Sequence, residues 1–300
     1  MKKSSLVSLL AFTLGLPALA LAQSGKVIDT LTLPSKILNM DRKYAVYLPP
    51  DYDTSQRSYP VLYLLHGGGD DQTGWVQFGE VQHIADEAIR LGTATPMVII
   101  MPDADTGRRG YNNTPDGQWN YEDFFFKELM PYVEQKYRIK AAKRYRAVAG
   151  LSMGGGGSFL YALHHPELFA AACPLSADCG PISLADAKES MHRYDKNGTY
   201  TDAQVEAYYK YRSVLALIDA IPLPNKDDPK AADPRKATRW YIDCGDGDFL
   251  YEGNSLVHIA MRKKEIPHEF RVRDGEHNWT YWRAALPTVL SFVSDSFHQY

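Results

Sequence analysis

A serine, a histidine and an aspartate, each within two residues of a glycine, are the residues of this 300-residue sequence best suited to chemistry. Ser152 is the centre of a Gly-x-Ser-x-Gly sequence, His277 follows Asp-Gly-Glu, and Asp248 ends the sequence Cys-Gly-Asp-Gly-Asp. A serine hydroxyl is a weak nucleophile at neutral pH unless a histidine removes its proton, and a carboxylate holds that histidine in the required tautomer. The three residues therefore indicate acyl transfer, with Ser152 as nucleophile, His277 as base and Asp248 as acid. Asp246 lies in the same loop and fits the role of the acid equally well on these physical grounds.

The sequence around Ser152 predicts the local structure that would expose such a serine. The apolar run 147–149 leads into Gly150, and small residues and a helix-compatible segment, 158–163, follow Gly154. A serine at a sharp turn between a strand and a helix is a nucleophile elbow, in which small neighbours let the backbone fold back on itself. The first N–H groups of the helix would then favour a developing oxyanion. A glycine-rich packing turn is the alternative interpretation.

A second glycine cluster follows the continuously apolar run 61–65, which is typical of a buried parallel strand. The cluster begins at His66 and continues with three glycines. Glycines at the end of a parallel strand let a backbone N–H turn toward a ligand, and we assign that oxyanion donor to Gly68. His66 itself is expected to be a packed, hydrogen-bonded residue rather than a catalytic one.

The remaining elements follow the alternation of an α/β protein. Strands are predicted at 27–33, 42–48, 97–101, 169–175, 240–243 and 268–272, and helices at 81–91, 121–137 and 281–293, the second kinked at Pro131. The candidate residues occur in the chain order Ser152, Asp248, His277, each just beyond a predicted strand, as in the α/β-hydrolase triad. We therefore predict the α/β-hydrolase fold, a mostly parallel sheet flanked by helices.

Aromatic residues supply the candidate substrate contacts. The segment 181–239 is rich in charge and tyrosine, with helical material at 202–219, and is interpreted as a helical insertion over the active site. Trp119, in a long loop after a strand, and Trp279, two residues after His277, are the other candidates. Packing is the alternative role for each of these rings.

Composition indicates a folded globular protein, with 45% hydrophobic and 23% charged residues. Residues 1–22 combine two lysines, an apolar run and Ala-Leu-Ala, which predicts a signal peptide cleaved after Ala22 and a secreted or periplasmic location for a single domain, 23–300. An uncleaved membrane anchor is the alternative. Removal of Lys2 and Lys3 would take the net charge from −3 to −5, which disfavours nucleic acid as a partner.

The three cysteines are too few for a disulfide framework. A bridge between Cys173 and Cys179 is one possibility, and buried free thiols are the other. Since no cysteine or histidine has metal-ligand spacing, we predict neither a metal nor another cofactor.

Together these motifs resemble the esterase D-like family of α/β-hydrolases, which includes feruloyl and acetyl xylan esterases of carbohydrate esterase family one. The resemblance rests on the glycines after His66, on Gly-Leu-Ser-Met-Gly-Gly, on Cys-Gly-Asp-Gly-Asp and on the ending His-Asn-Trp-Thr-Tyr-Trp. It implies that the N–H groups of Gly68 and Met153 form the oxyanion hole, and it favours Asp248 over Asp246 as the acid. The segment 181–239 is longer than in many relatives.

The resemblance implies a secreted serine carboxylic-ester hydrolase that releases feruloyl or acetyl groups from xylan or its fragments. Family members that hydrolyse formylglutathione are cytosolic, and the predicted signal peptide argues against that activity. Siderophore trilactone esterases, general short-acyl esterases and acyltransferases are alternatives within the family. A carbohydrate-binding protein on a hydrolase fold is the alternative from another class, and the sequence leaves the oligomeric state open.

Overall fold

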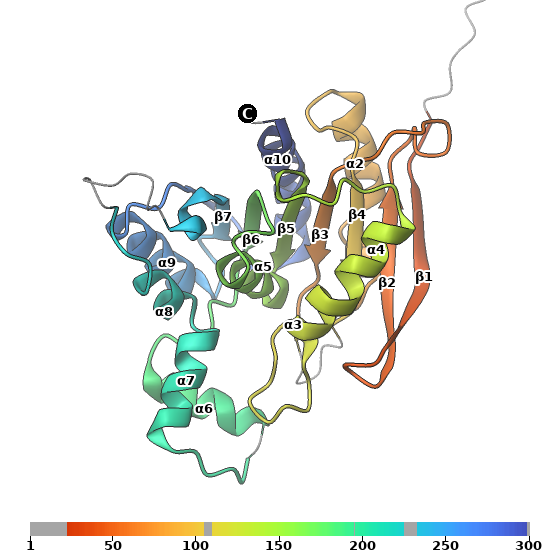
Figure 1. Ribbon diagram of the computed structural model, residues 1–300. Coiled ribbons are helices and arrows are strands. Elements are labelled where there is room, and N and C mark those ends of the chain that lie inside the picture. The colour runs from red at the N-terminus through yellow and green to blue at the C-terminus, as the bar shows by residue number, and fades with distance from the viewer. Residues whose placement is uncertain (1–22, 105–109, 195, 225–232, 299–300) are drawn as a thin grey trace, which may run out of the picture.

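The computed structural model describes residues 23–298 except 105–109, 195 and 225–232. The predicted signal peptide lies outside the described residues. One eight-stranded sheet runs through the protein in the order β1-β2-β4-β3-β5-β6-β7-β8 (Figure 1). The strands are β1 (Lys26–Ser35), β2 (Met40–Leu48), β3 (Val61–Leu65), β4 (Val98–Pro102), β5 (Arg146–Leu151), β6 (Ala171–Leu175), β7 (Arg239–Gly245) and β8 (Glu269–Arg273). The β1–β2 and β2–β4 pairs are antiparallel, and the other pairs are parallel.

Helices cover both faces of the sheet. They are α1 (Gly74–Gln77), α2 (Val81–Arg90), α3 (Tyr121–Phe124), α4 (Met130–Lys136), α5 (Met153–His164), α6 (Leu184–Tyr194), α7 (Asp202–Arg212), α8 (Val214–Asp219), α9 (Tyr251–Lys263) and α10 (Trp279–His298). One core lies between the sheet and α3, α4, α5, α8 and α9, and the other between the sheet and α2 and α10. Val61, Tyr63 and Leu65 of β3 enter the first core, and Leu62 and Leu64 the second. This alternation explains why β3 is apolar throughout.

The predicted α/β-hydrolase fold is confirmed, and the strands lie within a few residues of the predicted ranges. The helix predicted over 121–137 is divided, because a π-helical turn at Phe125–Leu129 joins α3 to α4 and the N–H of Met130 donates to the carbonyl of Phe125. This wide turn comes just before Pro131, which has no N–H to donate to the carbonyl four residues earlier. Helix α9 was not predicted.

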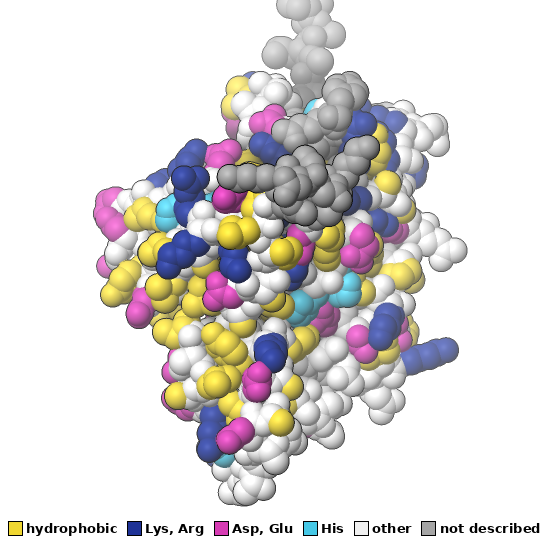
Figure 2. Space-filling view, turned by 60° about the vertical axis from the view of Figure 1, so that its left-hand side comes forward, with side chains coloured by type: hydrophobic (Ala, Val, Ile, Leu, Met, Phe, Trp, Pro, Cys, Tyr) yellow, Lys and Arg dark blue, Asp and Glu magenta, His cyan; other side chains and the backbone are white. Residues whose placement is uncertain are grey.

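The segment 181–239 is largely helical where the structure describes it. Helices α6, α7 and α8 fall within it, and α6 and α7 extend beyond the end of the sheet (Figure 1). Seen from the side of these helices, Lys and Arg side chains are interspersed with Asp, Glu and apolar side chains (Figure 2). Among the described helices, none has the length and apolar character needed to cross a membrane.

All three cysteines are buried free thiols, so the structure favours the second of the two sequence-based possibilities. Burial raises the pKa of each thiol, to about 12 for Cys244. In the described part of the chain, no three His, Cys, Asp or Glu side chains are grouped as metal ligands would be. The expectation that no metal is needed stays a prediction.

Candidate active site

Ser152 lies at the turn between β5 and α5 with φ 54° and ψ −117°, a conformation that is strained for a residue other than glycine. Helix α5 starts so close to β5 and to the end of β3 that Cβ atoms at the flanking glycines would clash with backbone. At Gly150 such an atom would lie 2.6 Å from the carbonyl oxygen of Gly154, and at Gly154 it would lie 2.5 Å from that of Leu65. Both glycines of the motif are therefore required by packing. The helix begins at Met153, earlier than the segment 158–163 suggested.

The structure brings Ser152, His277 and Asp248 into one hydrogen-bonded line, although they are far apart in the sequence. His277 Nε2 lies 2.9 Å from Ser152 Oγ, and His277 Nδ1 lies 3.0 Å and 2.9 Å from the two carboxylate oxygens of Asp248. A carboxylate can only accept, so Nδ1 carries a proton and Nε2 is left to accept from the serine hydroxyl. This tautomer is the one that a general base requires.

The environment of Asp248 keeps its carboxyl group ionised. The side chain is 1% exposed, and burial alone would raise its pKa. Hydrogen bonds from His277, from the N–H of Leu250 and from the Ser176 hydroxyl outweigh that effect, so the pKa lies below its ordinary value. Asp246, in contrast, is exposed and accepts a hydrogen bond from the N–H of Gly275 at 3.1 Å.

Two residues that the sequence analysis did not single out as site residues, Ser176 and Trp282, contact Asp248 and His277. Ser176 follows β6 with a φ of 43°, is fully buried and donates to Asp248. The indole N–H of Trp282 donates to Ser176 Oγ at 3.0 Å, and its ring lies edge-on to His277 with 4.9 Å between the ring centroids. The signal for Ser176 was its position directly after a buried parallel strand, the place where Ser152 and Asp248 also occur.

Of the two expected oxyanion donors, Met153 directly follows Ser152, and Gly68 belongs to a loop that passes close to it. Met153 is the first residue of α5, so its N–H has no acceptor within the helix. A Cβ atom at Gly67 would lie 3.5 Å from Cβ of Ser152, whereas one at Gly68 would meet no atom within 4 Å. The glycine loop therefore passes next to the serine, with open space at Gly68.

The two tryptophans named as substrate contacts are packed. Trp119 is 2% exposed, and its indole N–H donates to the carbonyl of Gly110 at 2.8 Å. The substrate role expected for Trp119 is not supported, because its ring is enclosed by its own loop and by the neighbouring Tyr121. Trp279 is half-buried and packs edge-on to Trp75, with ring centroids 5.1 Å apart, which matches the alternative interpretation.

A cavity of about 610 Å³ lies between α6, the start of α5 and the loop after Asp248, and we call it the entrance pocket. Its charged lining residues are Asp178, Asp186, Glu189, Arg193, Arg212 and Glu252. Apolar residues at its edge include Met153, Ile182 and Phe249. Phe249 is 70% exposed and its ring centroid lies 4.5 Å from that of His277, so this aromatic ring lies next to both the pocket and His277.

Helix α7 forms one wall of the pocket, and a buried polar cluster holds its C-terminal end. Glu122 Oε1 lies 2.8 Å from His164 Nδ1 and 3.1 Å from His165 Nε2, while Oε2 accepts from the Tyr211 hydroxyl at 2.5 Å. Burial alone would raise the pKa of Glu122, but these three partners lower it to about 2. The cluster joins the ends of α5 and α7 to α3.

We expect Glu122→Gln to destabilise the protein by about 3 to 5 kcal/mol at pH 7, because it breaks a buried charged contact. The folded-state pKa of about 2 lies below the ordinary value of 4.5, so this stabilisation is present above pH 4.5 and is lost as the pH falls toward 2. Thermal melts from pH 7 to pH 3 should show the wild type and the variant converging. Glu87→Gln, which removes an exposed pair with Arg90, is the control and should change neither the midpoint nor its pH dependence.

The fold and the site together define an α/β-hydrolase domain with a nucleophile elbow, a histidine and a buried acid at the carboxyl ends of β5, β8 and β7. The family model described as "Putative esterase" matches residues 35–293. The chain therefore belongs to this esterase family.

Individual relatives agree with this assignment. A solved structure of a ferulic acid esterase is 36% identical and superposes with a TM-score of 0.77, covering 91% of this chain and 99% of that one. Esterase MT1326 of Mycobacterium tuberculosis is 41% identical over 143 residues, which are 46% of this chain and 29% of that protein. An endo-1,4-beta-xylanase/feruloyl esterase of Xylanibacter ruminicola is 37% identical over 131 residues, 41% of this chain and 18% of that protein. The matches thus span less than a third of these two curated relatives.

Proposed function

We propose that this chain is a serine esterase that hydrolyses carboxylic esters through an acyl-enzyme. The observation that carries the proposal is the hydrogen-bonded line from Asp248 through His277 to Ser152. Its tautomer leaves His277 Nε2 free to take the serine proton, and the strained elbow presents Ser152 beside the start of α5.

In the acylation step, Ser152 Oγ bonds to the ester carbonyl carbon while its proton moves to His277 Nε2. The carbonyl π electrons become the oxyanion, which accepts from the N–H groups of Gly68 and Met153. The bond to the alcohol oxygen then breaks, and the alcohol leaves with the proton from His277. In deacylation a water molecule repeats the sequence, giving its proton to His277 and its oxygen to the acyl carbon, and Ser152 regains its proton as the acid leaves.

We further propose that the acyl group is aromatic, with feruloyl esters of plant cell-wall polysaccharide favoured over acetyl esters. The exposed ring of Phe249, next to the catalytic histidine and on the edge of the entrance pocket, offers a face on which a phenolic ring can stack. The volume of about 610 Å³ is in the range of small-molecule sites. The relatives described as feruloyl or ferulic acid esterases support the same assignment.

The charge of the entrance pocket favours a neutral substrate. Four carboxylates and two guanidinium groups line it among the described residues. Arg212 lies 2.8 Å from Asp178, and Arg193 lies 3.7 Å from Glu189, so each arginine is paired with an acid of the same pocket. An anionic substrate such as a glutathione thioester would meet the excess negative charge. The export signal of residues 1–22 and a location near plant polymers remain part of this proposal.

We expect 4-nitrophenyl ferulate to be hydrolysed with a higher kcat/KM than 4-nitrophenyl acetate, which has the same leaving group, and S-formylglutathione with a much lower one. Phe249→Ala should lower kcat/KM for the ferulate about 5- to 20-fold, because it removes an aromatic contact worth about 1 to 2 kcal/mol. The acetate should change less than about twofold, since it has no ring to stack.

Phe78→Ala is the matched control, because Phe78 is also an exposed phenylalanine but packs against Trp279 outside the pocket. It should leave the ratio of the two esters unchanged. Equal turnover of both esters, or an equal loss on both in Phe249→Ala, would contradict the feruloyl assignment and leave a general short-acyl esterase.

A further inference from the structure

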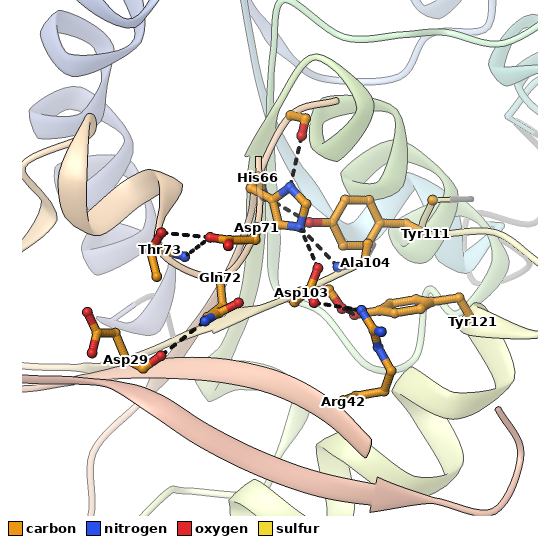
Figure 3. A network of polar contacts seen from close by, with 12 residues as sticks. Asp29, Arg42, His66, Asp71, Gln72, Thr73, Asp103, Ala104, Tyr111 and Tyr121 are labelled. Atoms are coloured by element: carbon orange, nitrogen blue, oxygen red, sulfur yellow. Dashed lines mark hydrogen bonds and ion pairs between the residues drawn. The ribbon is translucent and has the colours of Figure 1, made fainter. Parts of the chain in front are cut away.

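His66 is a buried side chain that the mechanism above does not use. It lies between the end of β3 and the first glycine of the loop. It is 1% exposed, as expected from the sequence for a packed histidine. Its ring lies between two backbone groups (Figure 3). His66 Nδ1 is 2.8 Å from the carbonyl oxygen of Gly67, and Nε2 is 3.0 Å from the N–H nitrogen of Ala104.

These two contacts fix the tautomer of the ring. A backbone N–H can only donate, so Nε2 accepts from Ala104 and carries no proton. A carbonyl can only accept, so the proton lies on Nδ1 and His66 is neutral. Asp103 Oδ1 lies 3.8 Å from Nε2, beyond hydrogen-bond distance, and Oδ2 of the same carboxylate pairs with Arg42 at 2.8 Å.

The charges around the ring agree with a neutral histidine. Burial lowers the pKa of His66 and is the largest influence on it. The Gly67 carbonyl, Asp103 and Asp71 act in the opposite direction, and Arg42 lowers the pKa further. The network that surrounds the ring therefore holds the Nδ1–H form.

The contact with Gly67 determines where the next N–H points. The carbonyl of Gly67 and the N–H of Gly68 belong to one planar peptide, and no cis peptide occurs in the described residues, so the two groups point in opposite directions. The Gly67 carbonyl accepts from His66 Nδ1 and also from the N–H of Asp70 at 3.3 Å. Holding this carbonyl therefore sets the direction of the Gly68 N–H.

Such a restraint is needed because both residues of the peptide are glycines. Without Cβ atoms, rotation of the Gly67–Gly68 peptide meets little steric resistance, and an alternative orientation would remove the N–H from the oxyanion. The rest of the loop is fixed independently: the N–H of His66 donates to the Tyr111 hydroxyl at 2.8 Å, and the indole of Trp75 donates to the carbonyl of Leu65 at 3.0 Å.

We propose that His66 is a positioning residue for the oxyanion hole: its Nδ1–H holds the Gly67 carbonyl and thereby directs the Gly68 N–H toward the oxyanion. This inference rests on the proposed function, in which Ser152 forms an acyl-enzyme and Gly68 supplies one of the two oxyanion donors. His66 touches no reacting atom and acts only through the peptide between the two glycines.

The test compares His66→Asn with His66→Gln. The Asn amide nitrogen occupies the place of Nδ1 and can still donate to Gly67, whereas the Gln side chain reaches the place of Nε2 and can only replace the contact with Ala104. We expect His66→Gln to lower kcat for 4-nitrophenyl acetate about 100-fold with little change in KM, as for loss of one oxyanion donor. His66→Asn should retain kcat within about tenfold of the wild type.

The inhibition constant of a tetrahedral analogue is a second measurement, and it would not change if His66 only stabilised the fold. A trifluoromethyl ketone adds to Ser152 and places an oxyanion in the hole, so its inhibition constant should rise in His66→Gln by the same factor by which kcat/KM falls. Tyr63→Phe is the control, because it also removes a buried hydrogen bond, at 3.0 Å to Glu134, but away from the loop. It should change the melting temperature and leave both kinetic quantities unaltered.

The proposal is overturned if Asn is no better than Gln, if the analogue binds both variants as tightly as the wild type, or if kcat follows only thermal stability. Nitrogen-15 NMR of the wild-type chain tests the tautomer without any variant, and a proton on Nε2 at pH 7 would also overturn it. Normal turnover in both variants, together with an inactive Ser152→Ala, would refute the inference and leave the esterase function standing. Full activity of Ser152→Ala would refute the function itself.

Discussion

Ser152→Ala is expected to lower kcat for 4-nitrophenyl acetate by about 10⁵- to 10⁶-fold, and His277→Ala by a similar factor. The reason is that Ser152 supplies the nucleophile and His277, 2.9 Å away, supplies the base that activates it, so neither works without the other. The double variant should therefore be hardly slower than either single variant. Steady-state kinetics measures all three losses. The wild-type kcat is first corrected for the fraction of active enzyme, which is the fraction that a fluorophosphonate labels.

The control for these variants is Ser296→Ala. Ser296 is also a buried serine, and its hydroxyl donates to the carbonyl of Phe292 at 2.9 Å, in α10 and away from the elbow. Its kcat should equal that of the wild type. If the losses in Ser152→Ala and His277→Ala multiplied in the double variant, the two residues would act independently and the proposed triad would be wrong.

The parallel strands were predictable because their two faces pack against two cores. A strand buried on both sides must be apolar at every position, and Val61–Leu65 and Val98–Pro102 are therefore conspicuous in the sequence. Helix α9 was missed because its pattern is weak: only Asn254, Val257 and Met261 are buried along its length. The π-helical turn was also missed: its i→i+5 hydrogen bonding shifts the helical phase, but the successive residues Phe124, Phe125 and Phe126 are all apolar and hide that shift in the sequence.

The candidate site was predictable where a residue type has few other uses in its context. A serine between two glycines at the end of a strand, or a histidine directly after Asp-Gly-Glu, has a recognisable local pattern. Trp119 and Phe249 show that a local pattern does not tell whether an aromatic ring is packed or exposed. Tryptophan and phenylalanine serve both packing and recognition, so only the fold decides that Trp119 is enclosed and Phe249 exposed. The position of Ser176 directly after β6 marks it as a candidate, but its hydrogen bond to Asp248 in the loop after β7 is a tertiary contact that the sequence pattern does not encode.

Asp248→Asn should lower kcat by about 10³- to 10⁴-fold at pH 7. The His277 Nδ1 proton now has two carboxylate oxygens within 3.0 Å, and an asparagine in their place would present an N–H on one side. The imidazole would then favour the tautomer with its proton on Nε2, facing Ser152, and could not accept the serine proton. Binding of a substrate analogue should be unchanged, because Asp248 is buried beneath the histidine.

Two other aspartates, one in β7 and one in the loop after it, serve as controls for Asp248→Asn. They test whether the loss of kcat comes from the contact with His277 or only from the loss of a carboxylate in this region. Asp246 is exposed and accepts one hydrogen bond, from the N–H of Gly275, which asparagine can also accept, so Asp246→Asn should keep kcat within about twofold.

Asp243 is as deeply buried as Asp248, but its carboxylate binds Arg273 at 2.9 Å and the hydroxyls of Tyr241 and Tyr281 rather than the base. Asp243→Asn should therefore lower the melting temperature while the kcat of the folded fraction stays near that of the wild type. A crippled Asp246→Asn beside a fully active Asp248→Asn would reverse the assignment. A kcat loss in Asp243→Asn as large as in Asp248→Asn would show that burial of an acid in this region, and not its contact with His277, is what the enzyme requires.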